Sequence, residues 1–434
     1  WFHNPIHGRA ANQVKYGGMN QKSTAFRNIF ITVFFIFFIF AMLGGLFWAN
    51  LLFVQRSSAP LDFLPWWKGA NNLLVEGLSP YGEFTTYEIQ KMVYGRAAGP
   101  AELPLRVDIP LPLLLLFLPL GGFSDMELAR AAWMVVLEIS LILMVVFSTR
   151  LAEWRLRWFE LLLIFLFGIL FSFSLESLLS ASSAILLAML LFGSIAAANA
   201  SLDELSGMLL AFSFFEIEIG GLLLLFLLIW AVLNARWRIL AGTLMTLTLL
   251  VAISFIIDPE WILSFTLAAI INWRTNADPS TLSLFTNWFP GLGEQIAWGL
   301  TFVLLLLLMV ESQQALRRGP LQWFWVACLS AAITPLTGLP VKSAGLVMLL
   351  PAILLSVSVL VQRWAVIGRW FGLLVLLVVF TVSWLFANFE VESGFIWISL
   401  ITIALLYWVR WWVARPNRLW ADRISTERGG YVSR

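Results

Sequence analysis

The sequence is poor in the side chains that metal proteins and redox proteins most often use. Among 434 residues it holds one cysteine, Cys328, and two histidines, His3 and His7. A single cysteine cannot form an intramolecular disulfide. Two histidines in a polar N-terminal stretch exclude paired membrane histidines as haem ligands, and they exclude a histidine-ligated metal within a bilayer.

Charge is also scarce, whereas apolar residues are abundant. Only 12% of the residues are charged and 60% are hydrophobic, with 36 Phe and 23 Trp, which is outside the range of soluble domains. The apolar runs are long and lack an alternation of period two. In lipid the backbone must satisfy its own hydrogen bonds, so these runs predict helices and not a barrel. We therefore predict an all-α, polytopic integral membrane protein.

The apolar runs predict about twelve transmembrane helices. Several runs are shorter than the roughly 20 residues that a straight crossing needs, so we expect those only inside a bundle. With both termini cytoplasmic, most of the 27 lysines and arginines fall on the inner side, as the positive-inside rule requires. The predicted spans are residues 29–54, 126–149, 158–175, 181–199, 206–216, 219–233, 239–257, 296–311, 322–336, 344–361, 368–387 and 395–413.

This topology predicts one transmembrane domain over residues 29–413. Residues 1–28 form a cytoplasmic N-terminal extension, and residues 414–434 form a cytoplasmic tail. Whether the polar residues before Met19 are native stays open. The plasma (inner) membrane is the predicted location, with the active face outside.

Two outer loops of substance are predicted, residues 55–125 and 258–295. If the run IPLPLLLLFLPL, residues 109–120, crossed the membrane, the arginines that follow the next span would lie on the outer side, against the positive-inside rule. We interpret it as an interfacial helix broken by Pro119. No Gly-rich phosphate loop is present, and the inner turns are short. We therefore expect function on the outer side, with no nucleic-acid partner.

The stretch LDFLPWWKGANNLLVEGLSPYGE, residues 61–83, predicts an amphipathic helix over residues 62–77. Its apolar and small side chains recur at helical spacing, so it is expected to lie flat with its tryptophans toward the membrane. Asp62 is a natural N-cap and Gly77 a natural stop. A second short helix is predicted from about Phe84 to Tyr94. The Asp62 carboxylate can cap the helix, act as a general base at the membrane surface, or do both.

The order of these features resembles the GT-C superfamily of polytopic glycosyltransferases. It is most similar to the polyprenol-phosphate-mannose-dependent α-mannosyltransferases. The resemblance rests on DFLPWWKGANNLLVEGLSPY after the first span, and then on IPLPLLLLFLPLGGF before the second. It continues in NARWRILAG, TPLTGLP, VMLLPA and QRW, and covers roughly residues 29–415.

The resemblance implies transfer of a sugar, mannose in this family, from a polyprenyl-phosphate donor with inversion at the anomeric carbon. The acceptor would be lipid-linked or an envelope glycan. Asp62 would be the general base. The donor phosphate needs cations, and we predict Arg130, Lys342 and Arg274 for this role. The donor is a co-substrate, and no resident cofactor is predicted.

Glu216 and Glu218, in SFFEIEIGG, depart from the family, which usually has a Lys-Pro pair near this place. They are candidates for acceptor binding or, as an open alternative, for a divalent metal that would bridge them. The usual Tyr-Pro-Pro is also replaced, by Ile-Pro-Leu-Pro. These departures motivate the alternative that the protein is a catalytically degenerate GT-C-like membrane subunit of a larger complex. A transporter is a third reading, which the absence of an internal repeat disfavours.

Overall fold

The computed structural model describes residues 10–58, 60–99, 102–275, 278–315, 319–389, 391 and 393–414. Within these ranges the regular structure is helical, and the one isolated β-bridge joins Ser280 to Pro340. The chain divides into two compact units, Trp1–Ser57 and Ser58–Arg434. The predicted all-α class is therefore confirmed.

The described part of unit 1 is dominated by one long helix, α1 (Ala10–Val54). Its part from Phe30 to Val54 has 25 residues and a mean hydropathy of 2.6, which is long and apolar enough to cross a membrane. The side chains of Phe30 and Phe37 are exposed, as expected of a helix whose surroundings are lipid. This helix agrees in length and composition with the first predicted span, residues 29–54.

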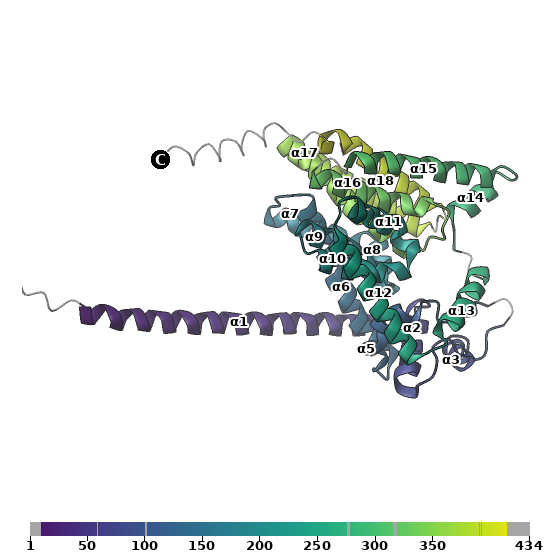
Figure 1. The fold of residues 1–434 in the computed structure, drawn as a ribbon, viewed down its shortest axis with the longest axis horizontal. Coiled ribbons are helices and arrows are strands. Elements are labelled where there is room, and N and C mark those ends of the chain that lie inside the picture. The colour runs from purple at the N-terminus through teal and green to yellow at the C-terminus, as the bar shows by residue number, and fades with distance from the viewer. Residues whose placement is uncertain are drawn as a thin grey trace, which may run out of the picture. The chain divides into compact units, whose positions relative to one another are not determined.

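Unit 2 begins with the short helices of the first predicted outer loop (Figure 1). Helix α2 (Phe63–Asn71) continues into the π-helix η1 (Asn72–Glu76), which ends at Gly77 with φ of 65°. Helix α3 (Glu83–Tyr94) confirms the second predicted short helix. The apolar proline-containing run forms three short pieces, namely α4 (Leu111–Leu114), η2 (Leu115–Phe117) and α5 (Leu118–Gly121).

The tryptophans of α2 face the protein and not the membrane, which corrects the predicted orientation. Trp66 and Trp67 are buried, and the Trp66 ring lies 5.2 Å from the ring of Phe117. The broken run that holds Phe117 covers the apolar face of α2, and it therefore takes the place that lipid was expected to occupy.

The middle of unit 2 combines long and short helices. They are α6 (Met126–Leu151), α7 (Trp158–Leu170), α8 (Ser172–Leu179), α9 (Ala184–Asn199), α10 (Asp203–Ala211), η3 (Phe212–Phe215), α11 (Ile217–Leu233), α12 (Trp237–Ile257) and α13 (Trp261–Thr275). Helices α7 and α8 are bent by 57° at their junction, where Phe171 has an extended ψ of 125°.

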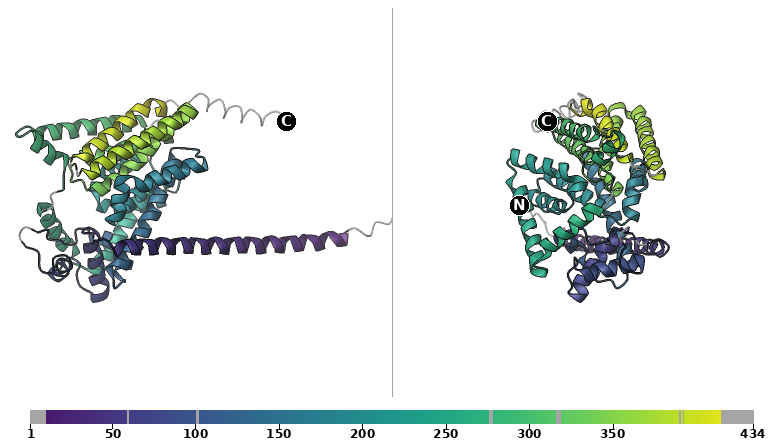
Figure 2. Two further views of the ribbon diagram at one scale, coloured as in Figure 1. Left: turned by 180° about the vertical axis from the view of Figure 1, so that it is seen from behind. Right: turned by 90° about the vertical axis from the view of Figure 1, so that its right-hand side faces the viewer.

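The C-terminal part of unit 2 supplies the remaining helices. They are α14 (Thr281–Trp288), α15 (Gly293–Ala315), α16 (Pro320–Ile333), η4 (Thr334–Leu336), η5 (Ser343–Leu349), α17 (Leu350–Asn388) and α18 (Gly394–Ala414). In the views of Figures 1 and 2, α14–α18 gather at one end of unit 2 and α2–α5 at the other, with α6 and α9–α12 between them.

The prediction of twelve crossings is wrong. Among the described residues, seven segments are long and apolar enough to cross a membrane, or eight if the bent pair α7–α8 counts as one span. Two of the seven, Ser343–Trp364 and Val366–Asn388, come from η5 and the long helix α17. Helices α9, α11 and α16 have 16, 17 and 14 residues. At 1.5 Å per residue these reach only about 21–26 Å, short of the roughly 30 Å of a hydrocarbon core. The apolar runs were correctly recognised, but their lengths do not make each one a span.

The most deeply buried element is the central segment around α16, η5 and the first turns of α17. Trp325 in α16 is fully buried, and its indole Nε1–H donates to the main-chain oxygen of Leu406 in α18 at 2.8 Å. Ser356 and Ser358 in α17 are also buried and donate to carbonyls of their own helix. This segment carries the loop that positions the site described below.

Helices α10 and α12 pack at glycine, and this contact yields a testable prediction. A Cβ atom at Gly207 would meet the main-chain oxygen of Ile239, and Thr243 Oγ1 donates to the Gly207 oxygen at 3.1 Å. Gly207→Ala is expected to force the helices apart and to lower the free energy of unfolding by about 1–3 kcal/mol. The measurement is the thermal midpoint of the purified protein in detergent.

The matched control for this prediction is Gly299→Ala in α15. A Cβ atom at Gly299 has no heavy atom within 4 Å. Because alanine also has the higher helix propensity, Gly299→Ala should leave the midpoint unchanged or raise it slightly. Equal midpoints for the two variants would contradict the close packing of α10 on α12.

Candidate functional site

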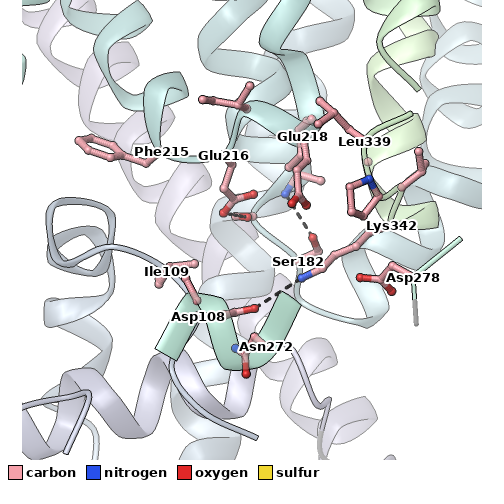
Figure 3. A pocket seen from close by; sticks show the side chains of 18 of the residues that line it. Asp108, Ile109, Ser182, Phe215, Glu216, Glu218, Asn272, Asp278, Leu339 and Lys342 are labelled. Carbon is pink, nitrogen blue, oxygen red and sulfur yellow. Dashed lines mark hydrogen bonds and ion pairs between the residues drawn. The ribbon is translucent and has the colours of Figure 1, made fainter. Parts of the chain in front are cut away.

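A cavity of about 440 Å³ lies where several interrupted helices of unit 2 end (Figure 3). Its walls come from segments far apart in the sequence. They include Asp108 before α4, Ser183 before α9, Glu216 before α11, Asn272 in α13 and Lys342 before η5. Four carboxylates and one ammonium group are among the lining side chains, which are those of Asp108, Glu216, Glu218, Asp278 and Lys342.

Lys342 is held by the loop that joins η4 to η5. The main-chain N–H of Val341 donates to the Pro279 oxygen at 2.9 Å, and the neighbouring Pro340 bridges to Ser280. Gly338 has φ of 82°, which only glycine adopts readily, and it turns this loop. The loop is therefore fixed directly before Lys342 by main-chain contacts, independently of the lysine side chain.

The Lys342 ammonium group lies between two carboxylates. Its Nζ is 3.7 Å from Asp108 Oδ2 and 3.9 Å from Asp62 Oδ1. Burial of the lysine opposes its charged form, but the carboxylates of Asp108 and Asp62, together with Glu216, outweigh that cost and raise the pKa of Lys342. The raised pKa keeps the Lys342 side chain a cation at neutral pH.

Asp62 occupies the N-cap position of α2 without capping the helix. Its side chain accepts no hydrogen bond from the first turn, so the expected capping bond is absent. The carboxylate is instead paired with Lys342. Burial raises the pKa of Asp62, Lys342 opposes this rise, and the neighbouring carboxylates of Asp108 and Asp278 add to it.

Asp108 was missed by the sequence analysis, although it lies in the site. Its Oδ1 accepts a hydrogen bond of 2.7 Å from the indole Nε1–H of Trp66, and its Oδ2 faces Lys342. The available signal was a carboxylate directly before the apolar run that starts at Ile109. A charge at that position must find partners when the run is buried.

Glu216 and Glu218, which the sequence analysis proposed as one ligand-binding site, both line the cavity. Glu216 occupies the N-cap position of α11 without a side-chain capping bond, and it accepts a hydrogen bond of 2.7 Å from Ser183 Oγ. Burial raises the pKa of Glu216 to about 7, against the opposing effects of Ser183 and Lys342. Glu218 is exposed at the cavity wall. In the described part of the chain, no group of three or more His, Cys, Asp or Glu side chains is arranged to hold a metal ion.

The two predicted arginines differ from Lys342 in their placement. Arg130 in α6 is buried, and its guanidinium donates to the main-chain oxygens of Ser58 at 2.9 Å and Leu179 at 2.6 Å. It ties the segment before α2 to the end of α8 and is not among the residues that line the cavity. The side chain of Arg274 lies outside the described residues.

Comparisons with known proteins return nothing for this chain. No protein-family model matches it, no curated protein matches it, and no solved structure matches it. What the structure itself defines is the class, an all-α integral membrane protein whose described residues hold seven or eight candidate spans and a cavity lined by charged side chains.

The raised pKa of Glu216 predicts a pH-dependent stability. Its folded pKa of about 7 is above the ordinary value of 4.5, so folding favours the protonated form. The stabilising contribution is therefore complete below the ordinary value and is lost as the pH rises through 7. Glu216→Gln, which stays neutral, should raise the thermal midpoint at about pH 8 and leave it nearly unchanged at about pH 5.

The matched control is Glu260→Gln, the same change at an exposed position between α12 and α13. It should change the midpoint little at either pH. If Glu216→Gln shifted the midpoint equally at both pH values, the burial of a titrating carboxylate at this position would be contradicted.

Proposed function

We propose that the protein is a membrane glycosyltransferase of GT-C type, with the cavity as its active site. It moves a sugar, mannose in the resembling family, from a polyprenyl-phosphate donor to a lipid-linked or envelope acceptor. The reaction inverts the anomeric carbon and takes place at the outer face of the plasma membrane. Both termini are cytoplasmic in this proposal, and an even number of crossings, eight when α7–α8 counts as one, would place them on the same side.

One observation supports this proposal above the others. Asp62, at the start of the first helix after α1 in the chain, has its carboxylate 3.9 Å from the ammonium of Lys342, which lines the cavity. A carboxylate with a raised pKa is suited to accept a proton from an acceptor hydroxyl. A cation beside it is suited to the departing lipid phosphate. The two groups that inverting sugar transfer would need, a carboxylate base and a cation for the phosphate, therefore lie side by side.

The remaining walls agree with a sugar ligand. Trp66 and Phe265 give the cavity aromatic surfaces, and Asn272 and Ser182 add neutral hydrogen-bonding groups. Ligand sites commonly combine apolar walls with a few placed polar groups. A volume of about 440 Å³ lies within the usual size range of such sites.

The first test is Asp62→Asn in the purified protein. Because asparagine keeps the shape but cannot accept the proton, the rate of transfer from polyprenyl-phosphate mannose should fall about 10²–10⁴-fold. Folding should be retained, since Asp62 makes no capping hydrogen bond. The measurement is the rate at which radiolabelled mannose is transferred to membrane acceptors, with polyprenyl-phosphate mannose as the sole sugar donor.

The control is Asp125→Asn, the same substitution at an exposed residue before α6. It should retain the wild-type rate. A similar rate for the wild-type protein and Asp62→Asn would exclude Asp62 as the base. Absence of transfer by the wild-type protein with the mannose donor would count against this donor.

The second candidate function is a catalytically degenerate subunit of a larger membrane complex. The charge of the cavity favours it, because Lys342 is the one basic side chain among the lining residues, whereas four are carboxylates. Excess negative charge repels a lipid phosphate. Purification in mild detergent from native membranes distinguishes the two. Stable co-migration with other subunits and no sugar transfer would support the subunit, and an active monomer would exclude it.

A further inference from the structure

The two carboxylates that face Lys342 are held very differently. Asp108 uses one oxygen to accept the hydrogen bond from Trp66 Nε1 at 2.7 Å and presents the other to Lys342 at 3.7 Å. Trp66 is itself buried and packs against Phe117, so the indole is a fixed donor. Asp108 is therefore anchored, and the position of its second oxygen is set by the fold.

Asp62 has no such anchor among the described contacts. Its described polar contact is the pair with Lys342 at 3.9 Å, and its side chain is 38% exposed, compared with 28% for Asp108. A distance of 3.9 Å is longer than a direct hydrogen bond. The ammonium is thus shared between a fixed carboxylate and a freer one, and it lies in full hydrogen-bond contact with neither.

We propose that Asp108, anchored by the indole of Trp66, is a positioning residue that holds the Lys342 ammonium back from Asp62. It acts through Lys342 and does not touch the reacting atoms. With Asp108 in place, the Asp62 carboxylate keeps an oxygen available to a substrate hydroxyl. Without Asp108, Lys342 pairs with Asp62 alone and occupies that oxygen. This role deepens the proposed glycosyltransferase function and rests on it.

The charges that face Asp62 come from several elements. They are Lys342 before η5, Asp108 before α4, Asp278 before α14, and Glu176 of α8, which accepts a hydrogen bond from Ser343. Glu216 and Glu218 act on the same lysine. Asp108 contacts both Lys342 and Trp66, so its removal changes the site more than the loss of one distant carboxylate would.

The test measures the protonation of Asp62 directly, without an activity assay. A membrane-permeant carbodiimide modifies carboxyl groups in their protonated form, and mass spectrometry quantifies the labelled peptide at each pH. In Asp108→Asn the labelling midpoint of Asp62 is expected to move to lower pH, because Lys342 then stabilises the Asp62 carboxylate alone. An unchanged midpoint, or one at higher pH, would overturn the proposal. Asp62→Asn verifies the assignment, since the labelled peptide must disappear.

A double-mutant cycle with Lys342→Met separates action through the lysine from direct repulsion between the carboxylates. In the Lys342→Met background, Asp108→Asn should shift the Asp62 midpoint by much less than in the wild type. Shifts of equal size in both backgrounds would show that Asp108 acts by direct repulsion, and the positioning role would be wrong. Each variant is first checked for a monodisperse peak in detergent, and labelling is compared only between folded variants.

An activity assay distinguishes failure of the positioning role of Asp108 from failure of the proposed glycosyltransferase function. If the wild-type protein transfers the sugar, Asp108→Asn should lose about tenfold in rate near neutral pH and move the acidic limb of its pH profile to lower pH. A loss of rate without a moved limb would indicate a merely structural role and overturn the positioning role. If the wild-type protein transfers no sugar, the proposed function fails, while the labelling cycle still decides whether Asp108 positions Lys342.

Discussion

The structure depends on one constraint, which is that main-chain hydrogen bonds inside an apolar bundle must be satisfied within the protein. Helices α9, α11 and α16 are too short to cross alone. The start of α9 and the end of α16 are buried inside unit 2, and the start of α11 lines the cavity. Each end exposes main-chain groups that lack partners in the helix. Turns with serine and proline adjoin these ends, namely Ser182 and Ser183 before α9 and TPLTGLP, residues 334–340, after α16. The interrupted helices thus place polar main-chain groups and polar side chains inside an otherwise apolar bundle.

The cavity is a consequence of these interruptions. Lys342, Glu216 and Asp108 each lie at the start of a short element, where the chain leaves one helix or loop and enters another. A charge at such a place is costly unless it meets an opposite charge. Lys342 and the carboxylates supply opposite charges to one another. The charged groups at the helix interruptions are therefore also the groups that could act as acid, base or phosphate ligand in the cavity.

Much of the fold was predictable because it follows from periodicity and composition. The helices at residues 63–76 and 83–94, the stop at Gly77 and the long spans were all expected from spacing. The number of crossings was not, because hydropathy alone does not distinguish a short buried helix from a span. For the site, Lys342, Asp62 and Glu216 were named from chemistry and position. Asp108 was missed because its partners Trp66 and Lys342 are 42 and 234 residues away, and only the fold brings them together.

The sharing of Lys342 also links donor binding to the strength of the base, if the cavity takes a lipid phosphate. A phosphate at Lys342 would compete with Asp62 and Asp108 for one ammonium. Asp108 is kept in place by Trp66, so Asp62 is the partner that loses contact. Loss of a cation raises the proton affinity of a carboxylate. The base would then be strongest when the donor is present and weaker when the site is empty, which favours transfer only in the loaded site.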